Sequence, residues 1–525
     1  MKSWARELLS FRKSEGGTKN GLLLIVAIFF LAISLTPAPK SLIALVSADQ
    51  PVGYQLQPGT TTITESVNKI LGTKLTPEQV AYKAKIMVAI LFMAAFLWAT
   101  ETVPLGATDL LVGSLLYLFF ILPLDRISKA YMKDAVFFIF GVLTIAIGMS
   151  KSGLDRRIGL TLLGRMRGLK SFCFVFLPLL SVAAGFLSEH ALVAILVPVL
   201  LGAYRLICDA HGIQKDRALA LLLLLGICFA ANQGGPGSPA AGGRNAVMVG
   251  YLKEFGKPIT FSQWMLYAMP YVLVMGMVVG GYVYLVFRRK IVVPDLDFRR
   301  FVGTEVGKIG RVTKKEALMG AIMLMVVTLW ITSSGRLGLG GPCILAVVLM
   351  LIFNVIDWKD LQTRVRFDVV GLYAAACAMG VGLKTTGASL WLARGVVGLL
   401  PEGMQQGDSL LIATSVFTGT MTNFMSDGAT VASLGPVVLS MAEIAQTHLW
   451  KVGLACAFSS SFANILIVGT PNNAIAYVGG TDPRSGERLL HLKDFLVYGM
   501  PVTILAWFVL WLWGILGYWK WMVWP

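Results

Sequence analysis

Charged side chains are scarce in this sequence. They account for only 14% of the 525 residues, whereas hydrophobic side chains account for 56%. A soluble protein of this length could not cover so much apolar surface with so few charges. The composition therefore excludes a soluble protein and predicts an all-α membrane protein that crosses the bilayer many times.

Several chemical signatures are also missing. The six cysteines lie singly inside apolar runs, without paired or metal-ligand spacing, so they are expected in the core. No acidic cluster of the Asp-x-x-x-Asp kind stands out, and no nucleophile with a base in reach, which argues against an enzyme. The Gly-rich stretch 232–243 lacks the Lys-Ser/Thr ending of a phosphate-binding loop. We therefore expect no catalytic activity, no cofactor and no ATP-driven step.

Apolar runs long enough to cross a bilayer, or to dip into one, recur from residues 21–37 to residues 493–519. Several runs are nearer to roughly 15 residues than to the 20 or so of a straight crossing, which is typical of half-helices and re-entrant hairpins. The pattern predicts about 11 transmembrane helices plus two re-entrant hairpins.

Basic residues outnumber acidic residues by 45 to 28, which gives a net charge of +17. They gather before the first apolar run and in the loops 151–170 and 288–315, which is the positive-inside pattern. We expect these loops in the cytoplasm, the Trp-rich C-terminus outside and no nucleic-acid partner. The segment 21–34 resembles the core of a signal peptide, but an uncleaved first span is favoured. The sequence thus predicts a multi-pass protein of the cell inner (plasma) membrane, surrounded by the lipid bilayer.

The chain contains two similar halves. The segment DAVFFIFGVLTIAIGMSKSG (134–153) aligns without a gap with DVVGLYAAACAMGVGLKTTG (368–387), and SEHALVAILVP (188–198) aligns with SDGATVASLGP (426–436). A duplicated half with a polar break in each copy is typical of secondary transporters built from two inverted-topology repeats. The expected domains are an N-terminal cytoplasmic segment with the first span (1–47), an extracellular loop (48–82), the first repeat (83–287), a cytoplasmic basic linker (288–315) and the second repeat (316–525).

Each half carries two unusual elements, a hairpin tip with a serine followed by an acid, and a later loop that interrupts an apolar helix. The tips are Ser188-Glu189-His190 and Ser426-Asp427-Gly428, and the loops are NQGGPGSPAAGGRNA (232–246) and GTPNN (469–473). Within a bilayer such breaks occur only where protein or a water-filled cavity satisfies the freed backbone groups. Half-helix N-termini direct amide donors at an anion, and unwound carbonyls can hold a cation.

Three segments resemble one known family. They are WATETVPLGATDLL (98–111), FGVLTIAIGMSKSGLDRRIGL (140–160) and, most specifically, VGTPNNAI (468–475). They are similar to motifs of the divalent anion/sodium symporter family, a solute carrier 13-like family of the ion transporter superfamily. The resemblance covers most of the chain from position 98 onward. It implies a homodimer whose protomers each have a scaffold domain and a transport domain with an elevator motion, importing di- or tricarboxylates or sulfate.

The chain departs from this family at the hairpin tips. The family's tips read Ser-Asn-Thr, whereas both Asn positions here are carboxylates, Glu189 and Asp427. An ionised carboxylate repels an anion and is costly in a low-dielectric site, so each must be neutralised. Three alternatives stay open. Each acid binds a sodium ion, each binds a proton, or Glu189 pairs with Arg244 or with a protonated His190.

Two sets of candidate site residues follow. The expected substrate-binding residues are Ser188, Glu189, His190, Ser426, Asp427, Gly428, Thr470, Pro471, Asn473 and Asn245. The expected sodium ligands are Ser188, Glu189, Gly234, Asp427, Thr422 and Gly469. Simpler roles compete: the acids and His190 could only support helices, Arg244 could lie at a cytoplasmic loop edge, and Asp134 and Asp368 are expected to cap helices.

The sequence predicts a secondary active symporter of a small anion, either sulfate, a sulfonate, or a di- or tricarboxylate. A sodium or proton gradient would drive it, with the anion bound between the two tips at the membrane midplane. The alternative is a cation/proton antiporter or metalloid-oxyanion exporter of the same superfamily that uses Glu189 and Asp427. The acidic tips favour the alternative, and the GTPNN loop favours the symporter.

We expect Asp427→Asn and Glu189→Gln to alter ion coupling more than folding, because both acids occupy matched positions at the expected site. Uptake by each variant under a sodium gradient and under a pH gradient measures this coupling. Wild-type transport with unchanged ion dependence in both variants would show that the tips have another role.

Overall fold

The structure is a computed structural model that describes residues 16–294, 303, 307, 310–482 and 484–525. The regular structure of these residues is helical, apart from an isolated antiparallel bridge between Thr481 and Arg488. The all-α prediction is therefore confirmed. Some basic residues of the predicted N-terminal segment and linker lie outside the described residues, namely Arg6, Arg12, Lys13, Arg299, Arg300 and Lys308.

The chain folds into two compact units, each of which takes segments from both halves of the sequence. Unit 1 comprises Met1–Met132, Phe367–Pro401 and Ala432–Gln446, and unit 2 comprises Lys133–Arg366, Glu402–Val431 and Thr447–Pro525. The predicted linker 288–315 follows α15 (Phe261–Phe287), and its last two residues are the first two of α17 (Lys314–Leu337).

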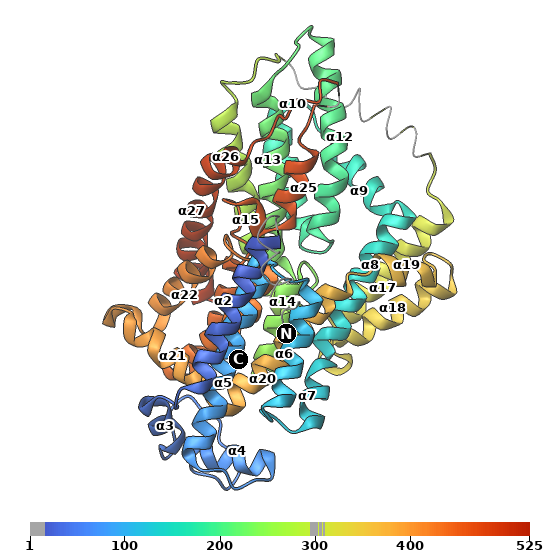
Figure 1. Ribbon diagram of the computed structural model, residues 1–525. Coiled ribbons are helices and arrows are strands. Elements are labelled where there is room, and N and C mark those ends of the chain that lie inside the picture. Colours follow the sequence, from blue (N-terminus) through green and yellow to red (C-terminus); the bar gives the residue numbers. More distant parts are fainter. Residues whose placement is uncertain (1–15, 295–302, 304–306, 308–309, 483) are drawn as a thin grey trace, which may run out of the picture. The chain divides into compact units, whose positions relative to one another are not determined.

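Unit 1 is built around α5 (Pro77–Thr100), which is buried along most of its length. The helix begins with a capping box, in which the side chains of Thr76 and Gln79 each accept a hydrogen bond from the other's backbone N–H. Helices α2 and α20 pack against α5, and Figure 1 shows α2 beside it. The other helices of unit 1 are α2 (Gly16–Leu35), α3 (Lys40–Ser47), α4 (Ile63–Leu71), α6 (Leu105–Leu118), α7 (Leu124–Tyr131), α20 (Phe367–Thr386) and α21 (Ala388–Leu399).

Unit 2 has a core of three helices that pack pairwise, α11 (Leu177–Ala184), α13 (Arg217–Gly234) and α15 (Phe261–Phe287). A second group, α12, α13 and α25, runs side by side (Figure 1). The remaining helices are α8 (Asp134–Ser152), α9 (Leu154–Leu163), α10 (Gly168–Ser171), α12 (Glu189–Ala210), α14 (Gly243–Glu254), α17 (Lys314–Leu337), α18 (Gly340–Ile352), α19 (Trp358–Arg364), α22 (Gly407–Met421), α24 (Leu449–Ser459), α25 (Pro471–Gly479), α26 (Leu492–Asp494) and α27 (Met500–Phe508). Helix α23 (Asp427–Ile444) begins in unit 2 and continues in unit 1. Short 3-10 or π-helical turns lie at Phe172–Phe176, Gly235–Gly237, Glu402–Met404, Ile467–Gly469, Phe495–Gly499, Val509–Ile515 and Tyr518–Lys520.

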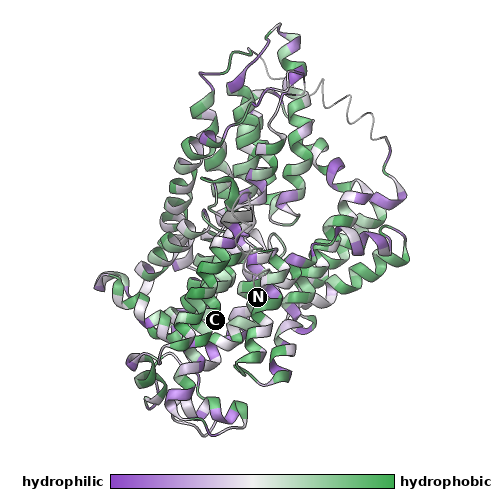
Figure 2. Cartoon of the chain, viewed as in Figure 1, coloured by the Kyte–Doolittle hydropathy of each residue, from purple (hydrophilic) through white to green (hydrophobic). Residues whose placement is uncertain are grey.

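Many of the helices are long and apolar enough to cross a membrane. Eight of those in the described residues qualify, or nine if the bent pair Lys19–Leu35 and Lys40–Ser47 is one span. Shorter apolar helices of 10 to 17 residues, such as Leu449–Ser459, accompany them. Figure 2 shows hydrophobic residues along the helices, with many of the hydrophilic ones at helix ends and connections. The chain is therefore a multi-pass membrane protein, and the predicted number of crossings stays a prediction.

Four ion pairs fasten the adjoining ends of α12 and α13 to the segment that follows α25. They are Arg205–Asp482, Lys215–Glu487 (2.5 Å), Arg217–Asp494 (2.7 Å) and Arg484–Asp209 (2.6 Å). In three pairs the acid lies after α25. In the fourth pair the base, Arg484, lies after α25 and the acid, Asp209, lies in α12. The helix that follows the first tip is thus tied to the helix that follows the second loop.

Asp134 lies in the first turn of α8, but its carboxylate caps a different helix. Its two oxygens accept hydrogen bonds from the backbone N–H groups of Leu339 (2.9 Å) and Gly340 (3.0 Å) at the start of α18. A negative charge at this position is favoured by the positive end of α18. The expectation that Asp134 caps a helix holds, with the correction that the helix is α18 and not the one that Asp134 begins.

Asp134→Ala should lower the free energy of unfolding by about 1–3 kcal/mol, because two backbone N–H groups lose a charged acceptor. Asp134→Asn should cost less, since its amide oxygen can still accept a hydrogen bond. Thermal unfolding of the detergent-solubilised protein measures both effects. Asp125→Ala, at an exposed acid in α7, is the matched control. Equal unfolding midpoints for Asp134→Ala and this control would contradict the capping role.

Candidate functional site

Two helices of unit 2 are interrupted by loops with the same internal bonding. The first loop separates α13 from α14, and the second separates α24 from α25. The Nδ2 atom of Asn245 donates to the backbone carbonyls 10 and 7 residues earlier, at 2.8 and 2.7 Å. The Nδ2 atom of Asn473 also donates to the carbonyls 10 and 7 residues earlier, at 2.8 and 2.9 Å. These two asparagines, which align in the sequence, therefore close their own loops in the same way.

The serine of each hairpin tip caps the helix that follows. Ser188 and Ser426 each accept a hydrogen bond through Oγ from the backbone N–H three residues later, at 3.4 and 3.3 Å. The acids that follow, Glu189 and Asp427, are the first residues of α12 and α23, where the helix dipole favours negative charge. Because the serines supply the caps, the acid side chains are left to bind other groups.

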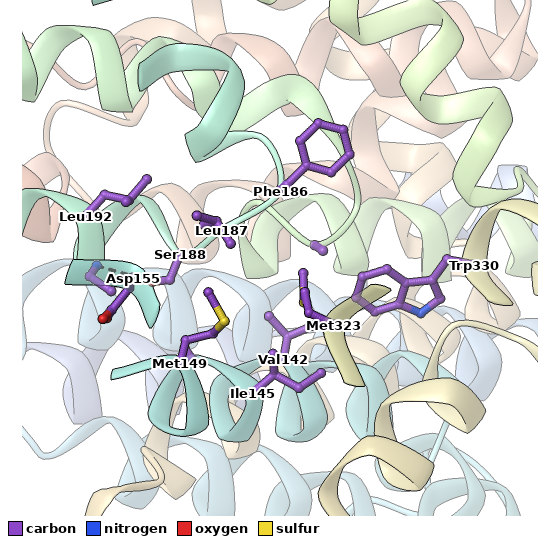
Figure 3. Close-up of a pocket in the computed structure, with 13 residues that line it drawn as sticks. Val142, Ile145, Met149, Asp155, Phe186, Leu187, Ser188, Leu192, Met323 and Trp330 are labelled. Atoms are coloured by element: carbon purple, nitrogen blue, oxygen red, sulfur yellow. Dashed lines mark hydrogen bonds between the residues drawn. The ribbon is translucent and has the colours of Figure 1, made fainter. Parts of the chain in front are cut away.

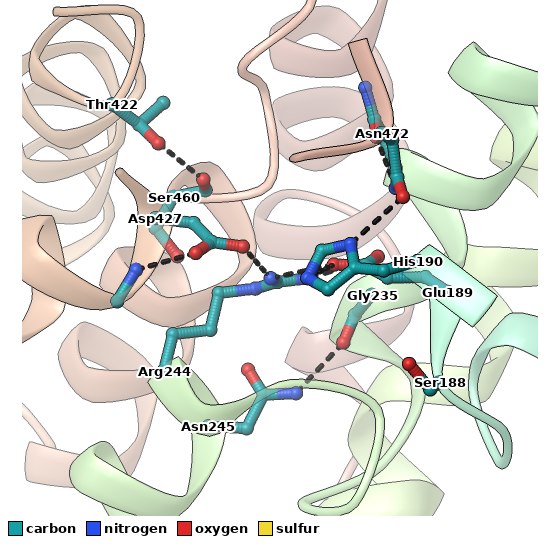
Figure 4. A network of polar contacts seen from close by, with 12 residues as sticks. Ser188, Glu189, His190, Gly235, Arg244, Asn245, Thr422, Asp427, Ser460 and Asn472 are labelled. Atoms are coloured by element: carbon teal, nitrogen blue, oxygen red, sulfur yellow. Dashed lines mark hydrogen bonds and ion pairs between the residues drawn. The ribbon is translucent and has the colours of Figure 1, made fainter. Parts of the chain in front are cut away.

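Arg244, in the first turn of α14, bridges the two tips (Figure 4). Its Nη1 and Nη2 atoms donate to the two carboxylate oxygens of Glu189 at 3.0 and 3.4 Å, and Nη1 also donates to Oδ2 of Asp427. Glu189 and Arg244 are only 1% and 2% exposed, and the side chain of Asp427 is 14% exposed. Of the three alternatives for neutralising Glu189, the structure has the pair with Arg244, and it adds Asp427 to that pair.

Two glycines of the first loop make room for the guanidinium. A Cβ atom at Gly242 would lie 2.8 Å from Nη1 of Arg244. A Cβ atom at Gly235 would strike Nη2 and lie 2.9 Å from Oε2 of Glu189. The glycines of this loop superficially suggest a phosphate-binding loop. Here they leave the space that the side chain of Arg244 occupies.

A chain of polar side chains runs from the first tip to the second loop. Nδ1 of His190 lies 2.8 Å from Oδ1 of Asn472, and Nδ2 of Asn472 donates to Oδ1 of Asn232 at 2.8 Å. Nδ2 of Asn232 donates in turn to Asn464 (3.1 Å) and Asn473 (3.3 Å). Because an amide oxygen only accepts, Nδ1 of His190 carries its proton in this contact. The two tips and the two loops are therefore linked by side chains as well as by packing.

The charged residues lie in a small cavity with little free space. The side chains that line it leave no room for a further water molecule, and they belong to Glu189, Asn232, Arg244, Asp427, Ser460, Ser461, Ala463 and Thr470. One lining residue is cationic and two are anionic, so the lining has a net charge of −1.

The expected sodium ligands fall into two groups. Ser188, Glu189 and Asp427 lie at the tips, while Thr422, Gly234 and Gly469 lie near the second tip or at the loops. The hydroxyl of Thr422 is buried and donates to the carbonyl of Ser460 at 2.6 Å. Within the described residues no group of three His, Cys, Asp or Glu side chains could hold a metal ion. The sodium site stays a prediction.

An apolar cavity borders the first tip (Figure 3). The cavity holds about 30 Å³ and lies among side chains of α8, α17 and the tip, including Met149, Leu187 and Trp330. Asp155 is the charged side chain in this lining; it is 4% exposed, and its Oδ1 accepts from the next backbone N–H at 2.6 Å. Ser188 contributes to this wall and Glu189 to the charged cavity. The tip therefore separates an apolar space from a charged one.

The predicted site residues take different places. Glu189, Asp427 and Thr470 line the charged cavity, and His190 joins the amide chain. The backbone N–H of Gly428 donates to Oδ1 of Asp427 at 2.6 Å, and Pro471 is the first residue of α25. The amides of Asn245 and Asn473 hold the loops, as described above. Whether any of these residues contacts a substrate stays a prediction.

Several polar residues of the site are absent from the sequence-based list. They are Asn232, Asn464, Asn472, Ser460 and Ser461, and Arg244 was weighed there without being assigned to the site. A signal was present, because these residues are polar positions in or beside breaks of apolar helices. Polar side chains are costly within a membrane, so their presence there is a signal for a functional site.

The fold and the site together define the class of protein. Apolar membrane-spanning helices, two helices broken at similarly bonded loops and a buried charged cluster beside them are the features of a membrane transporter. The family model described as "Sodium:sulfate symporter transmembrane region" matches residues 67–525. The chain belongs to this family, and the resemblance to divalent anion/sodium symporters is confirmed.

Individual relatives agree with this assignment. The sodium-dependent dicarboxylate transporter SdcS of Staphylococcus aureus (strain NCTC 8325 / PS 47) is 25% identical over 436 residues, which cover 77% of this chain and 82% of SdcS. SdcS of strain USA300 matches with the same identity and coverage. A solved structure of Neisseria gonorrhoeae MtrF, described with a class of antimetabolite efflux pumps, has a TM-score of 0.50 and 14% identity over 75% of this chain and 84% of MtrF. That likeness shows the fold alone. The family and these relatives are transporters, so the expectation that the chain is not an enzyme is confirmed.

Gly235→Ala should displace the guanidinium of Arg244 and lower the free energy of unfolding by about 1–3 kcal/mol, because the new methyl group overpacks the ion pair. Thermal unfolding in detergent measures the loss. Gly281→Ala, where the added Cβ would meet only Phe174 at 3.8 Å, is the matched control and should leave the midpoint unchanged or raise it. Equal unfolding midpoints for the two variants would mean that the position of the Arg244 guanidinium does not require a glycine at position 235.

Proposed function

We propose that the chain is a secondary active transporter of a small oxyanion, driven by a sodium or proton gradient, with the anion bound between the two hairpin tips. The observation that carries this proposal is the position of Arg244, whose buried guanidinium contacts both tips at once. A guanidinium is suited to carboxylates and other oxyanions because its planar N–H groups donate in parallel. The chain's own carboxylates occupy that group here, and a substrate oxyanion has the same chemistry.

We propose the remaining architecture because the two loops, and likewise the two tips, have matching hydrogen bonds. The equal loop bonding of Asn245 and Asn473 and the equal caps of Ser188 and Ser426 support two inverted-topology repeats. Two units that each draw on both halves support a scaffold domain, unit 1, and a transport domain, unit 2, with an elevator motion. The homodimer, the plasma-membrane location and the cytoplasmic N-terminus rest on the family resemblance and the basic loops.

The relatives suggest the candidate substrates and the candidate ion. The description of the family names sodium and sulfate, and the name of SdcS names sodium and a dicarboxylate. Sulfate, sulfonates and di- or tricarboxylates are therefore the anions to test, and sodium is the first coupling ion to test. Protons are the second, because a buried acid, Glu189, and a partly buried one, Asp427, lie in the site.

Those same acids favour a second candidate function. Intramembrane carboxylates carry protons in many pumps and exchangers, so Glu189 and Asp427 are compatible with a cation/proton antiporter or an oxyanion exporter. The direction of anion movement separates this candidate from the symporter.

Uptake into proteoliposomes tests the proposed function. Labelled sulfate, methanesulfonate and succinate are offered in separate runs, under an imposed sodium gradient or an imposed pH gradient. We expect at least one anion to accumulate under one of the gradients and not without it. Cation-for-proton exchange without uptake of any of the three anions would instead favour the antiporter.

A further inference from the structure

An apolar groove runs between α12 and α25, which lie side by side (Figure 1). The groove has a volume of about 670 Å³ and is lined by residues of these two helices and by Thr481, which follows α25. Its walls include the apolar side chains of Val197, Leu201, Ile475 and Val478. Ligand sites in proteins usually have volumes of about 300–1,000 Å³. The groove is therefore large enough to hold an apolar ligand.

The groove persists because α12 and α25 are fastened to one another on either side of it. Towards the tips, Nδ1 of His190 in α12 lies 2.8 Å from Oδ1 of Asn472 in α25. At the far end, Arg205 of α12 pairs with Asp482, which follows α25. Between these two ties the lining includes Ala194, whose side chain is a single methyl group. The side chains between the ties thus leave open the space that the ties define.

One end of the groove lies at the level of the lipid headgroups. Both helices run from the tips and loops toward the four ion pairs that fasten α12 and α13 to the segment after α25. The side chains of Arg484 and Glu487 in these pairs are 67% and 56% exposed. Exposed charges are costly in the apolar interior of a bilayer, so this end belongs at its surface. Because α12 is long and apolar enough to cross a membrane, the rest of the groove extends into the depth of the acyl chains.

Arg488 supplies a positive charge at the headgroup end of the groove. Its backbone forms the antiparallel bridge with Thr481, which lines the groove. Its guanidinium lies 4.1 Å from the centre of the Tyr477 ring, and its Nη1 atom donates to the carbonyl of Tyr477 at 2.7 Å. The four neighbouring bases each pair with an acid, but no acid of the described residues lies within ion-pair distance of Arg488. A guanidinium has five N–H donors, so Arg488 has donors left for an anion.

We propose that the groove binds an anionic phospholipid of the surrounding bilayer, with an acyl chain between α12 and α25 and the phosphate on Arg488. The apolar lining and the position of the groove along a membrane-spanning helix favour a lipid over a soluble ligand. The guanidinium without an acid favours a phosphate with a net negative charge. Capping the C-terminus of α25 accounts for one N–H of Arg488, but not for the groove beside it. This site shares no residue with the charged cavity and does not depend on the proposed function.

Matched lipids test the headgroup. The full chain is purified in detergent, stripped of lipid, and heated with phosphatidylglycerol or with phosphatidylcholine that carries the same acyl chains. We expect phosphatidylglycerol to raise the unfolding midpoint, because a ligand of the folded state stabilises it. It should do so at about one fifth of the concentration that phosphatidylcholine requires, since one basic contact near a membrane surface favours an anionic lipid about fivefold. Palmitate, which has an acyl chain and a charge but no phosphate, should act more weakly than phosphatidylglycerol.

Arg488→Gln tests the contact with the phosphate. This variant also loses a donor at the end of α25, so each midpoint shift is measured from the variant's own midpoint without lipid. We expect phosphatidylglycerol and phosphatidylcholine to act on it at equal concentrations, whereas Arg488→Lys should keep most of the preference because it keeps the charge. Lys493→Gln is the matched control, because it removes the same charge from an exposed position of the same segment. It should keep the preference of the wild type.

Ala194→Phe tests the place of the acyl chain. The new ring fills the groove from α12, so the response to both phospholipids should be lost. Leu206→Phe is the matched control, because it adds a ring to the same helix at a side chain that is 49% exposed and does not line the groove. Val478→Trp fills the groove from α25 at a side chain that is 71% exposed, and it serves as a second variant if Ala194→Phe fails to fold in gel filtration.

Four outcomes would overturn this inference. Equal action of the two phospholipids on the wild type would show that the headgroup is not selected, and equal action of palmitate would assign the groove to a free fatty acid. A full lipid response in the variants that fill the groove would place the lipid elsewhere. Loss of the preference in Lys493→Gln as well as in Arg488→Gln would reduce it to a general attraction between charges. Anion uptake, which tests the proposed function, is a separate measurement.

Discussion

The sharing of one guanidinium by two carboxylates is the interaction on which the site depends. Arg244, Glu189 and Asp427 come from three separate helices, α14, α12 and α23. Their charges are acceptable within a membrane protein because each has an opposite partner and because the surrounding helices keep them away from lipid. The helix next to the site, α13, belongs to a span whose most apolar window is 94% buried. The three charges therefore require the close packing of the unit 2 helices around them.

The frame around these charges is bonded independently of them. Asn245 and Asn473 close the two loops with bonds to backbone carbonyls, and Ser188 and Ser426 cap the helices at the two tips. None of these bonds involves the guanidinium or the acids. The charged side chains can therefore change partners while the backbone of tips and loops stays in place, which is the condition for a preorganised site.

Much of the fold could be predicted from the sequence, because it depends on local patterns. Apolar runs predict helices in a membrane, and the aligned segments predict that tips and loops correspond. The partners of the charged residues could not be predicted in this way. Arg244 is 55 positions from Glu189 and 183 from Asp427, and Asp134 is 205 positions from the helix end that it caps. Such contacts depend on how distant segments pack, so the sequence could not show that Glu189 and Asp427 share Arg244.

The independent bonding of the loops and tips has a consequence for how this kind of site can diverge. The asparagine and serine side chains preserve the shape of the frame whichever residues follow the serines at positions 189 and 427. Exchanging side chains at these two positions and at 244 alters the sign and number of charges without rebuilding a loop. If the transported anion binds at this site, as proposed, a few substitutions would change the charge of the cargo, while the surrounding helices are inherited unchanged.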